Sequence, residues 1–322
     1  MVDDATHNAP ARVRRALAAL KEKAEGYAES GKAGSTRRAY RSDWQDFVDW
    51  CAWRELASLP AEPSTVALYL AALAEDGKRP STIERRRAAI AFAHKEQGEI
   101  SPTHHAIVDE VIAGIRRELG ALQQGKTPAV TADIRAMVAS LAGDLRGTRD
   151  RALLLIGFAG AFRRSELVAL DVEDVTESAE GLLFTIRRGK TDQEGRGRLV
   201  GIPFGMQSTT CPVRAYQDWR HAASIDTGAL FRGISPHGKL LGRLSDKGVA
   251  RTVKRAAEAA GLDPSRYSGH SLRAGLATSA AAAGAFDRDI MRQTGHKRVE
   301  TLYRYIRKEN LFSDNVVKRT GL

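Results

Sequence analysis

The spacing of hydrophobic residues changes once along this chain, and that change constrains the fold most. Up to residue 119 the apolar side chains recur at helical spacing in four stretches, residues 35–51, 65–73, 82–96 and 106–119. Helical patterns continue at residues 131–142, 147–160 and 164–170, and helices resume after Pro212. Between them lie two short β-favouring runs joined by a Gly-rich loop, residues 182–188 and 198–202. The sequence predicts a mainly α fold with a small β hairpin or sheet.

A polar segment divides the helical patterns into two groups. Residues 123–130 contain Gly125 and Pro128 and show no periodicity, as is typical of a linker. The 322 residues are enough for two domains, which we expect at residues 31–122 and 131–308. Residues 1–30 are Ala-rich and charged without a lasting apolar stripe, and we expect a flexible or partner-ordered extension there.

Several classes of protein are disfavoured by composition. No apolar run approaches the ~20 residues of a membrane span, and the N-terminus does not resemble a secretory signal, so we expect a cytoplasmic protein with no membrane partner. The only cysteines, Cys51 and Cys211, form no metal-binding spacing, and we expect no metal site. Residues 120–127 match the letters of a phosphate-binding loop, but no strand precedes them and Pro128 follows.

Positive charge is concentrated towards the C-terminus. The chain has 50 Lys and Arg against 39 Asp and Glu, a net charge of +11. Residues 201–322 contribute 20 basic and 10 acidic residues to these totals. An uneven basic surface favours a polyanionic partner, most often a nucleic acid.

Two motifs in the second half place cations where they could bind an anion. Arg163 and Glu166 stand at the expected start of a helix, where the helix dipole reinforces anion binding, although a surface Arg–Glu pair has the same pattern. Lys190 stands at the tip of the expected hairpin, where it could reach into a neighbouring groove or remain a solvated turn lysine.

Two further motifs carry histidine and tyrosine. His270 and Arg273 are three residues apart and share one helix face, although a histidine that caps the helix would explain the pattern equally. His296 follows a glycine and precedes Tyr305 by nine residues. Tyr303 competes with Tyr305 for a role, and because residues two apart on a helix point about 200° apart, only one of them can face a common site.

The order of these residues resembles the tyrosine recombinase, or phage integrase, family over residues 35–308. The matching set is Arg163, Lys190, His270, Arg273, His296 and Tyr305. Short segments look most like Cre-like recombinases: Trp50-Cys51, residues 60–63, residues 268–273 and residues 305–307. His296 departs from that branch, whose members often have Trp at this position.

The resemblance implies a function and a role for each residue. It implies a site-specific DNA recombinase that cuts and rejoins strands through a 3′-phosphotyrosyl intermediate, without a metal or high-energy cofactor. Tyr305 would be the nucleophile, while Arg163, Arg273 and His296 would bind the phosphate. Lys190 would be the general acid, His270 would assist proton transfer at the tyrosine, and Glu166 would brace Arg163 or His270. Tyr303 and Tyr267 would serve packing or contact the DNA backbone.

The resemblance also implies an assembly and DNA contacts. A homotetramer would act on two double-stranded DNA sites with inverted repeats, and the free protein would be a monomer or weak oligomer. Residues 31–122 would be a core-DNA-binding domain. Residues 309–322, with an apolar pattern at Leu311 and Phe312, would dock on a neighbouring protomer or pack on their own domain. Expected DNA contacts, which could equally be solvated basic faces, are Arg37, Arg38, Arg41, Thr82, Arg85, Arg86, Lys247, Arg251 and Lys254.

Two kinds of rival function remain at this point. Type IB topoisomerases, integron-like integrases and telomere resolvases use related chemistry for other outcomes. A DNA-binding module that has lost catalysis would belong to another class, but the intact six-residue set argues against it.

Overall fold

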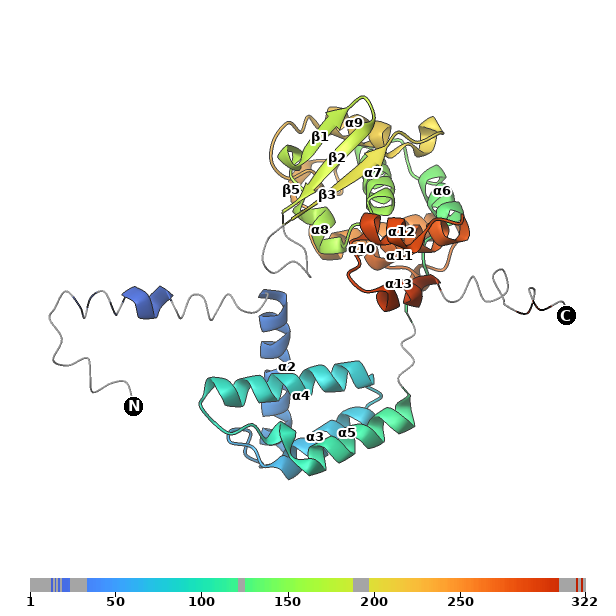
Figure 1. Cartoon of the computed structure of the whole chain (residues 1–322). Coiled ribbons are helices and arrows are strands. Elements are labelled where there is room, and N and C mark those ends of the chain that lie inside the picture. Colours follow the sequence, from blue (N-terminus) through green and yellow to red (C-terminus); the bar gives the residue numbers. More distant parts are fainter. Residues whose placement is uncertain are drawn as a thin grey trace. The chain divides into compact units, whose positions relative to one another are not determined.

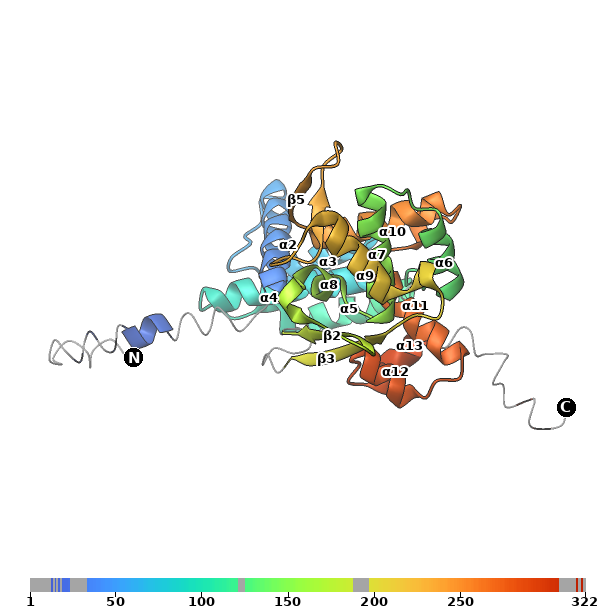
Figure 2. The same cartoon turned by 90° about the horizontal axis from the view of Figure 1, so that it is seen from above.

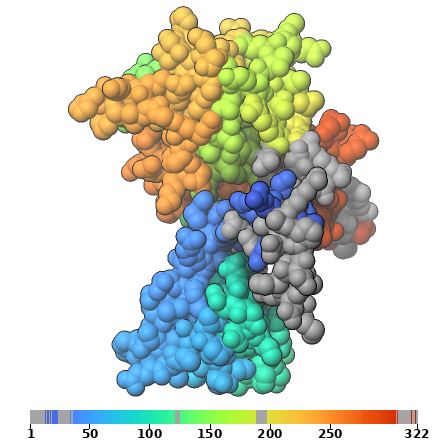
Figure 3. Space-filling view, turned by 90° about the vertical axis from the view of Figure 1, so that its left-hand side faces the viewer, coloured from blue at the N-terminus to red at the C-terminus, as the bar shows by residue number. Residues whose placement is uncertain are grey.

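The chain forms two compact units, Met1–Gln123 and Gln124–Leu322, each with a hydrophobic core of its own (Figure 1). The structure, a computed structural model, describes residues 13, 15, 17, 19–23, 34–120, 125–187, 197–306, 317 and 320. Lys190 lies outside these residues, as do most of the expected N-terminal extension and most of residues 309–322. Figure 3 shows the surface of the first unit in blue to green and that of the second in green to red.

Residues 34–119 of the first unit form a bundle of four α-helices. They are α2 (Gly34–Trp53), α3 (Pro63–Glu75), α4 (Pro80–Glu96) and α5 (Ala106–Leu119). Proline opens α3 and α4, at a position where its missing N–H leaves no hydrogen bond unmade. α2 packs on α4 and α3 on α5 (Figure 1), around a core that includes Phe47, Leu70 and Ile90. These helices differ from the predicted stretches by two residues or fewer at each end.

The second unit combines helices with two small antiparallel sheets, and the predicted mainly α fold with a small sheet is confirmed. Its helices are α6 (Thr131–Ala139), α7 (Leu145–Ala159), α8 (Arg164–Ala169), α9 (Pro212–Ala223), α10 (Asp246–Ala259), α11 (Gly269–Ala282), α12 (Asp287–Thr294) and α13 (Val299–Ile306). The strands are β1 (Val175–Ser178), β2 (Gly181–Ile186), β3 (Arg198–Pro203), β4 (Arg232–Ile234) and β5 (Leu240–Arg243).

One face of the three-stranded sheet covers the core of this unit. The strands are ordered β1-β2-β3, with Leu182 opposite Ile202 and Phe184 opposite Val200. These side chains are buried, whereas Leu199 on the other face is exposed, which is the alternation expected of a sheet with one wet face. Figure 1 shows α7 and α9, which pack on each other, behind this sheet. The buried face therefore fixes the register of β3.

Three of the five strands in the described part of the chain were missed by the sequence interpretation. β1 is short and polar on its exposed positions, and β4 and β5 are short strands rich in Gly and Arg. Neither pattern shows the alternation of apolar and polar residues that predicts a strand. The β4–β5 hairpin stands out from the body of the unit at the top of Figure 2.

Part of the expected linker belongs to the second unit. The Thr127 N–H donates to the Arg266 carbonyl at 2.9 Å, and the Ala129 N–H donates to the Ser271 carbonyl at 2.9 Å. Ala129 is also fully buried. These contacts attach residues 127–129 to the start of α11, which sequence periodicity could not reveal because the bonds join residues far apart in the chain.

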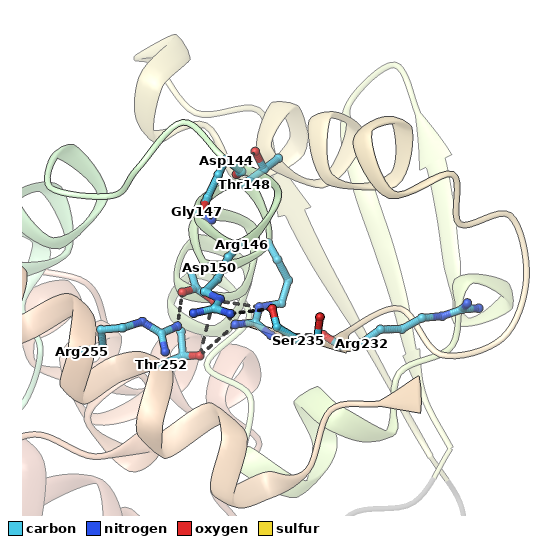
Figure 4. A network of polar contacts seen from close by, with 10 residues as sticks. Asp144, Arg146, Gly147, Thr148, Asp150, Arg232, Ser235, Thr252 and Arg255 are labelled. Atoms are coloured by element: carbon cyan, nitrogen blue, oxygen red, sulfur yellow. Dashed lines mark hydrogen bonds and ion pairs between the residues drawn. The ribbon is translucent and has the colours of Figure 1, made fainter. Parts of the chain in front are cut away.

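A buried ionic network joins α7 to α10 (Figure 4). Asp150 on α7 accepts a hydrogen bond from Arg149 Nε at 2.8 Å and forms an ion pair with Arg255 Nη2 of α10 at 2.5 Å. Arg149 also donates to the Arg232 carbonyl at 3.1 Å, at the base of the β4–β5 hairpin. The network fixes α10 and the hairpin to the central helix of the unit.

Among the described residues, no helix is both long enough and apolar enough to cross a membrane.

Candidate active site

Arg163 lies at the turn between α7 and α8 and is held by Glu166. Its Nη1 donates to Glu166 Oε1 at 2.5 Å, and its backbone N–H donates to Oε2 at 3.0 Å. Glu166 is only 2% exposed. The carboxylate therefore fixes both the main chain and the side chain of Arg163 at the start of α8.

The ionised form of Glu166 is favoured in spite of its burial. Burial tends to raise the pKa of Glu166, but the hydrogen bond from the Arg163 N–H and the charges of Arg163 and Arg198 outweigh it. The pKa is therefore lower than that of an ordinary glutamate. A carboxylate that stays charged can hold two guanidinium groups in fixed positions.

Arg273 is a buried cation with one unsatisfied donor. It lies on α11, is 1% exposed, and donates from Nη1 to the Ala161 carbonyl at 2.8 Å. Its Nη2 is buried with no hydrogen-bond partner among the described residues. Burial, followed by repulsion from Arg163, lowers the pKa of Arg273 to about 10, so the group remains charged at neutral pH. A buried charged donor without a partner is costly and indicates a site for an anion.

His270 and Tyr305 are in direct contact. The His270 Nε2 lies 2.6 Å from the Tyr305 Oη, which joins the first turn of α11 to α13. Ser268 caps α11 by accepting the His270 N–H at 3.2 Å, and Ser271 accepts the Ser268 N–H at 3.0 Å. This cap sets the direction in which His270 leaves the helix.

His296 stacks on the same tyrosine. The rings of His296 and Tyr305 have centroids 5.5 Å apart and planes 19° apart. The His296 Nδ1 lies 2.9 Å from Thr294 Oγ1, which also bonds to the Ile290 carbonyl at 2.7 Å. Because the single hydroxyl proton goes to that carbonyl, the Nδ1 carries the ring proton and Nε2 is left as an acceptor.

The charge state of His296 follows from its surroundings. Burial, followed by the charges of Arg273 and Arg163, lowers the pKa of His296 to about 4. The ring is therefore neutral at pH 7 while no anion is bound. An anion at this point would favour the protonated ring, whose Nε2 could then donate to it.

The structure separates the two competing tyrosines. Tyr303 donates from its hydroxyl to Asp287 Oδ2 at 2.8 Å, and is 39% exposed, whereas Tyr305 faces His270 and His296. The raised pKa of Tyr303, caused by its hydrogen bond to the Asp287 carboxylate, makes it a poorer nucleophile still. Tyr267 is buried and donates to Asp133 Oδ2 at 3.2 Å, contacts that favour the packing role over a DNA contact.

Five predicted residues thus meet in one place, from four separate parts of the second unit. They are Arg163, His270, Arg273, His296 and Tyr305, and Glu166 braces the first of them. Residues 131–311 match the phage integrase family.

The chain belongs to the phage integrase family. An integrase/recombinase xerD homolog from Selenomonas ruminantium is 41% identical over 306 residues, 93% of this chain and 89% of that protein. The tyrosine recombinase XerC of Herpetosiphon aurantiacus is 30% identical over 295 residues, which cover 90% of this chain and 89% of the XerC chain. This phage integrase family member is a tyrosine-type site-specific recombinase of the XerC and XerD kind.

A solved structure of low sequence identity has the same fold as this family member. The Tn1549 transposon integrase, solved in complex with transposon right end DNA, has a TM-score of 0.61 and 14% identity. The match covers 92% of this chain and 96% of that chain. The assignment to a Cre-like branch stays a prediction, since these relatives carry other names.

Two residues that support the candidate site were missed by the sequence interpretation. Arg198 on β3 binds Glu166 Oε2 at 3.1 Å, and Gln293 on α12 donates to the Ala159 carbonyl at 2.8 Å. The only signal for Arg198 is a charged residue that opens an otherwise apolar strand directly after the loop that carries Lys190. For Gln293 the sequence holds no such signal.

The expected DNA contacts of the second unit form an exposed stripe. Lys247, Arg251 and Lys254 are exposed on α10, while Val249 and Val253 on its other side are buried. The stripe has the geometry that the spacing predicts, and its contact with DNA stays a prediction.

The expected contacts of the first unit differ in their surroundings. Arg37, Arg38 and Arg41 are exposed on α2, and Thr82 on α4 is half-buried. Arg85 is exposed and forms an ion pair with Asp43 at 3.2 Å. Arg86 binds Asp46 and donates to the Tyr69 hydroxyl at 2.7 Å, so its guanidinium holds α2, α3 and α4 together.

No group of three or more His, Cys, Asp or Glu side chains within the described part of the chain is arranged to hold a metal ion.

Proposed function

We propose that this recombinase cuts and rejoins DNA strands at specific sites through a 3′-phosphotyrosyl intermediate on Tyr305. The observation that carries the proposal is the 2.6 Å contact between the Tyr305 Oη and the His270 Nε2. A base at hydrogen-bonding distance can take the phenol proton as the oxygen attacks. Two arginines near the same tyrosine supply the charge that a phosphate requires, and His296 would add to it by gaining a proton as the phosphate enters.

The reaction balances as a transesterification. The Tyr305 oxygen forms a bond to the scissile phosphorus while the bond from phosphorus to the 5′ oxygen breaks. The phenol proton passes to His270, and Lys190, which lies outside the described residues, donates a proton to the leaving 5′ oxygen. A 5′ hydroxyl of a partner strand then attacks the phosphotyrosine and reverses these steps. The ester bond conserves the energy of the original linkage, so rejoining needs no high-energy cofactor.

Charge on the non-bridging oxygens is balanced by a preorganised clamp. Glu166 holds Arg163 in place, and Arg273 offers a buried Nη2 that has no partner among the described residues. Such fixed donors stabilise a transition state more than flexible ones because they need no reorganisation. His296 would gain a proton as the phosphate enters and would then donate from Nε2. This clamp supplies charge that a metal ion would otherwise provide.

The partner we propose is double-stranded DNA with an inverted-repeat site, bound by four protomers that join two sites. The Tn1549 transposon integrase of the same fold was solved with DNA, and residues 201–322 of this chain hold a twofold excess of basic residues, 20 against 10. The exposed stripe on α10 and the exposed arginines of α2 would contact phosphates. Residues 309–322 would dock on the neighbouring protomer.

Covalent capture tests the nucleophile. Wild type, Tyr305→Phe and Tyr303→Phe are incubated with a pool of nicked random-sequence duplexes in EDTA and then denatured, and any DNA attached to protein is sequenced. Wild type and Tyr303→Phe should both form the adduct, because Tyr303 donates to Asp287 and not to the site. Tyr305→Phe should bind DNA but form no adduct.

Two outcomes would contradict the proposal. An undiminished adduct with Tyr305→Phe would place the nucleophile elsewhere. If wild type enriches a sequence but never becomes attached to it, the protein binds DNA without cutting it under these conditions, and the phosphotyrosyl intermediate is wrong.

A further inference from the structure

Arg198 occupies a position from which it reaches three parts of the site. It is the first residue of β3 and pairs with Ile186 on β2, the last pair of this ladder. Lys190 lies between these two residues in the sequence. The Arg198 side chain is 22% exposed. Its guanidinium lies 6.0 Å from the centre of the ring of Phe162, the residue that precedes Arg163 in the chain. An arginine this enclosed has little freedom to serve as an ordinary surface charge.

One end of the Arg198 guanidinium completes the brace on Arg163. Its Nη2 lies 3.1 Å from Glu166 Oε2, the same oxygen that accepts the Arg163 N–H at 3.0 Å. The other carboxylate oxygen binds the Arg163 Nη1 at 2.5 Å. Glu166 therefore lies between two guanidiniums and is held from both sides. Without Arg198, the carboxylate would keep only its two hydrogen bonds to Arg163, and the position of the Arg163–Glu166 pair would be less tightly fixed.

The other end of the guanidinium caps α12. Arg198 Nη1 donates at 3.0 Å to the carbonyl of Gln293, one of the last carbonyls of that helix, which have no partner within the helix. The chain then turns at Gly295, where φ is 69° and an added Cβ would lie 3.2 Å from Arg198 Nε. Glycine adopts this backbone conformation without strain and leaves the arginine in place, whereas an added Cβ would strain the turn and press on Arg198. His296 follows directly, so its position depends on this packing.

We propose that Arg198 is a positioning residue for strand cleavage, holding Arg163 through Glu166 and His296 through the end of α12. The inference rests on the proposed function, because it concerns the clamp that binds the scissile phosphate. Lysine cannot replace Arg198, since one ammonium group cannot reach a carboxylate and a carbonyl that a planar fork binds at its two ends. The role of Arg198 is to fix the distance between Arg163 and His296, the two groups that it holds and that would donate to the phosphate.

The test compares two forms of one DNA site. A nicked duplex with the sequence recovered by covalent capture is made with an ordinary scissile phosphate, and again with a methylphosphonate, which lacks one negative charge. Single-turnover adduct formation is measured for wild type, Arg198→Gln and Arg198→Lys. On the phosphate, Arg198→Gln should be slower by about tenfold to a hundredfold, less than for loss of a direct donor. On the methylphosphonate the loss should shrink to about threefold or less, because the clamp has less charge to balance.

Arg243→Gln is the matched control. Arg243 also joins a carboxylate to a carbonyl in the second unit, binding Asp171 at 2.5 Å and the Val168 carbonyl at 2.8 Å. Its loss should leave adduct formation unchanged within about twofold on both substrates, because neither partner holds a phosphate donor.

Three results would overturn the inference. An Arg198→Gln defect of equal size on both substrates would mean that Arg198 only supports the fold, and an unchanged rate would mean that it does not position the clamp. A lysine variant with the wild-type rate would remove the need for the fork. If Arg198→Gln does not fold, as judged by thermal melting, Arg198→Lys carries the same comparison. Wild type that forms no adduct at all would instead refute the proposed function itself.

Discussion

The protonation state of His296, on which its proposed role at the phosphate depends, is set by its burial and by nearby charges. His296 stacks on Tyr305, is 9% exposed, and is neutral because burial and two arginines lower its pKa to about 4. Its Nδ1 proton is directed at Thr294, which leaves Nε2 as an acceptor. The ring can become a donor only by gaining a proton, which a phosphate would favour.

The low pKa of His296 predicts a loss of stability in acid. In the unfolded chain the pKa returns to about 6.5, so the unfolded state takes up this proton first as the pH falls. The free energy of unfolding therefore keeps its full value above about pH 6.5 and falls between about pH 6.5 and pH 4. The contribution of His296 to this slope is at most about 1.4 kcal/mol per pH unit. Denaturant unfolding between about pH 5 and pH 7 should show a shallower decline for His296→Gln. Equal slopes for both proteins would show that His296 is not held neutral.

At the scale of residues, the sequence could indicate the site but not its geometry. The motif order suggested Arg163, His270, Arg273, His296 and Tyr305, and the structure brings all five together. The helical angle showed that only one tyrosine could face the site, and the bond from Tyr303 to Asp287 shows which one turns away. Arg198 was missed because its only sequence signal is a charge at the start of an apolar strand, and its partner Gln293 is 95 residues away in the chain, a contact that no periodicity records.

At the scale of elements, the second unit depends on the contact between α7 and α10. Asp150 is 2% exposed and is the shared partner of Arg149 and Arg255. Because α10 carries the exposed basic stripe and the Arg149 side chain also holds the base of the β4–β5 hairpin, one carboxylate positions two surface elements. A buried group with this many partners is costly to remove.

Removing the Asp150 carboxylate should destabilise the second unit strongly. Asp150→Ala leaves Arg149 and Arg255 without their partner, and loss of one member of a buried ion pair costs about 3 to 5 kcal/mol. Asp226→Ala is the control, since Asp226 pairs with Arg220 at 3.2 Å but its side chain is 88% exposed. The shift in denaturant midpoint should be large for the first variant and small for the second. Equal shifts would contradict a structural role for the network.

The helices were easier to predict than the strands. Amphipathic helices repeat their pattern over several turns, so the bounds of α2 to α5 were predicted within two residues. β1, β4 and β5 have only three or four residues each, too few for a period to emerge, and their pairing depends on partners supplied by the fold.

At the scale of the whole molecule, the candidate active site lies entirely in one of the two compact units. The second unit contains the tyrosine site and the stripe on α10, and the first is a four-helix bundle with exposed arginines on α2. In the proposed function both units bind one duplex, and assembly of four protomers depends on residues 309–322. In that proposed function, strands can be exchanged only after such an assembly has formed.

Deleting residues 309–322 should therefore weaken assembly without preventing binding of single protomers. Sedimentation of the protein with DNA that carries paired sites should show fewer complexes larger than a dimer. Binding to a single half-site is the internal control and should be retained, since the second unit keeps its core. Tetramers in undiminished amount would show that the segment packs on its own domain or has another role.

The carbonyl that anchors Arg273 belongs to the main chain of Ala161, whose backbone is left-handed with φ 46°. No exchange of side chain at that position can delete the acceptor, provided that the turn survives. Residue 161 can therefore be substituted by the few small residues that accept this conformation, and the hydrogen bond to Arg273 is kept. The feature that must be kept among homologues is the backbone turn that presents this carbonyl, and a sequence alignment, which compares side chains, does not show it.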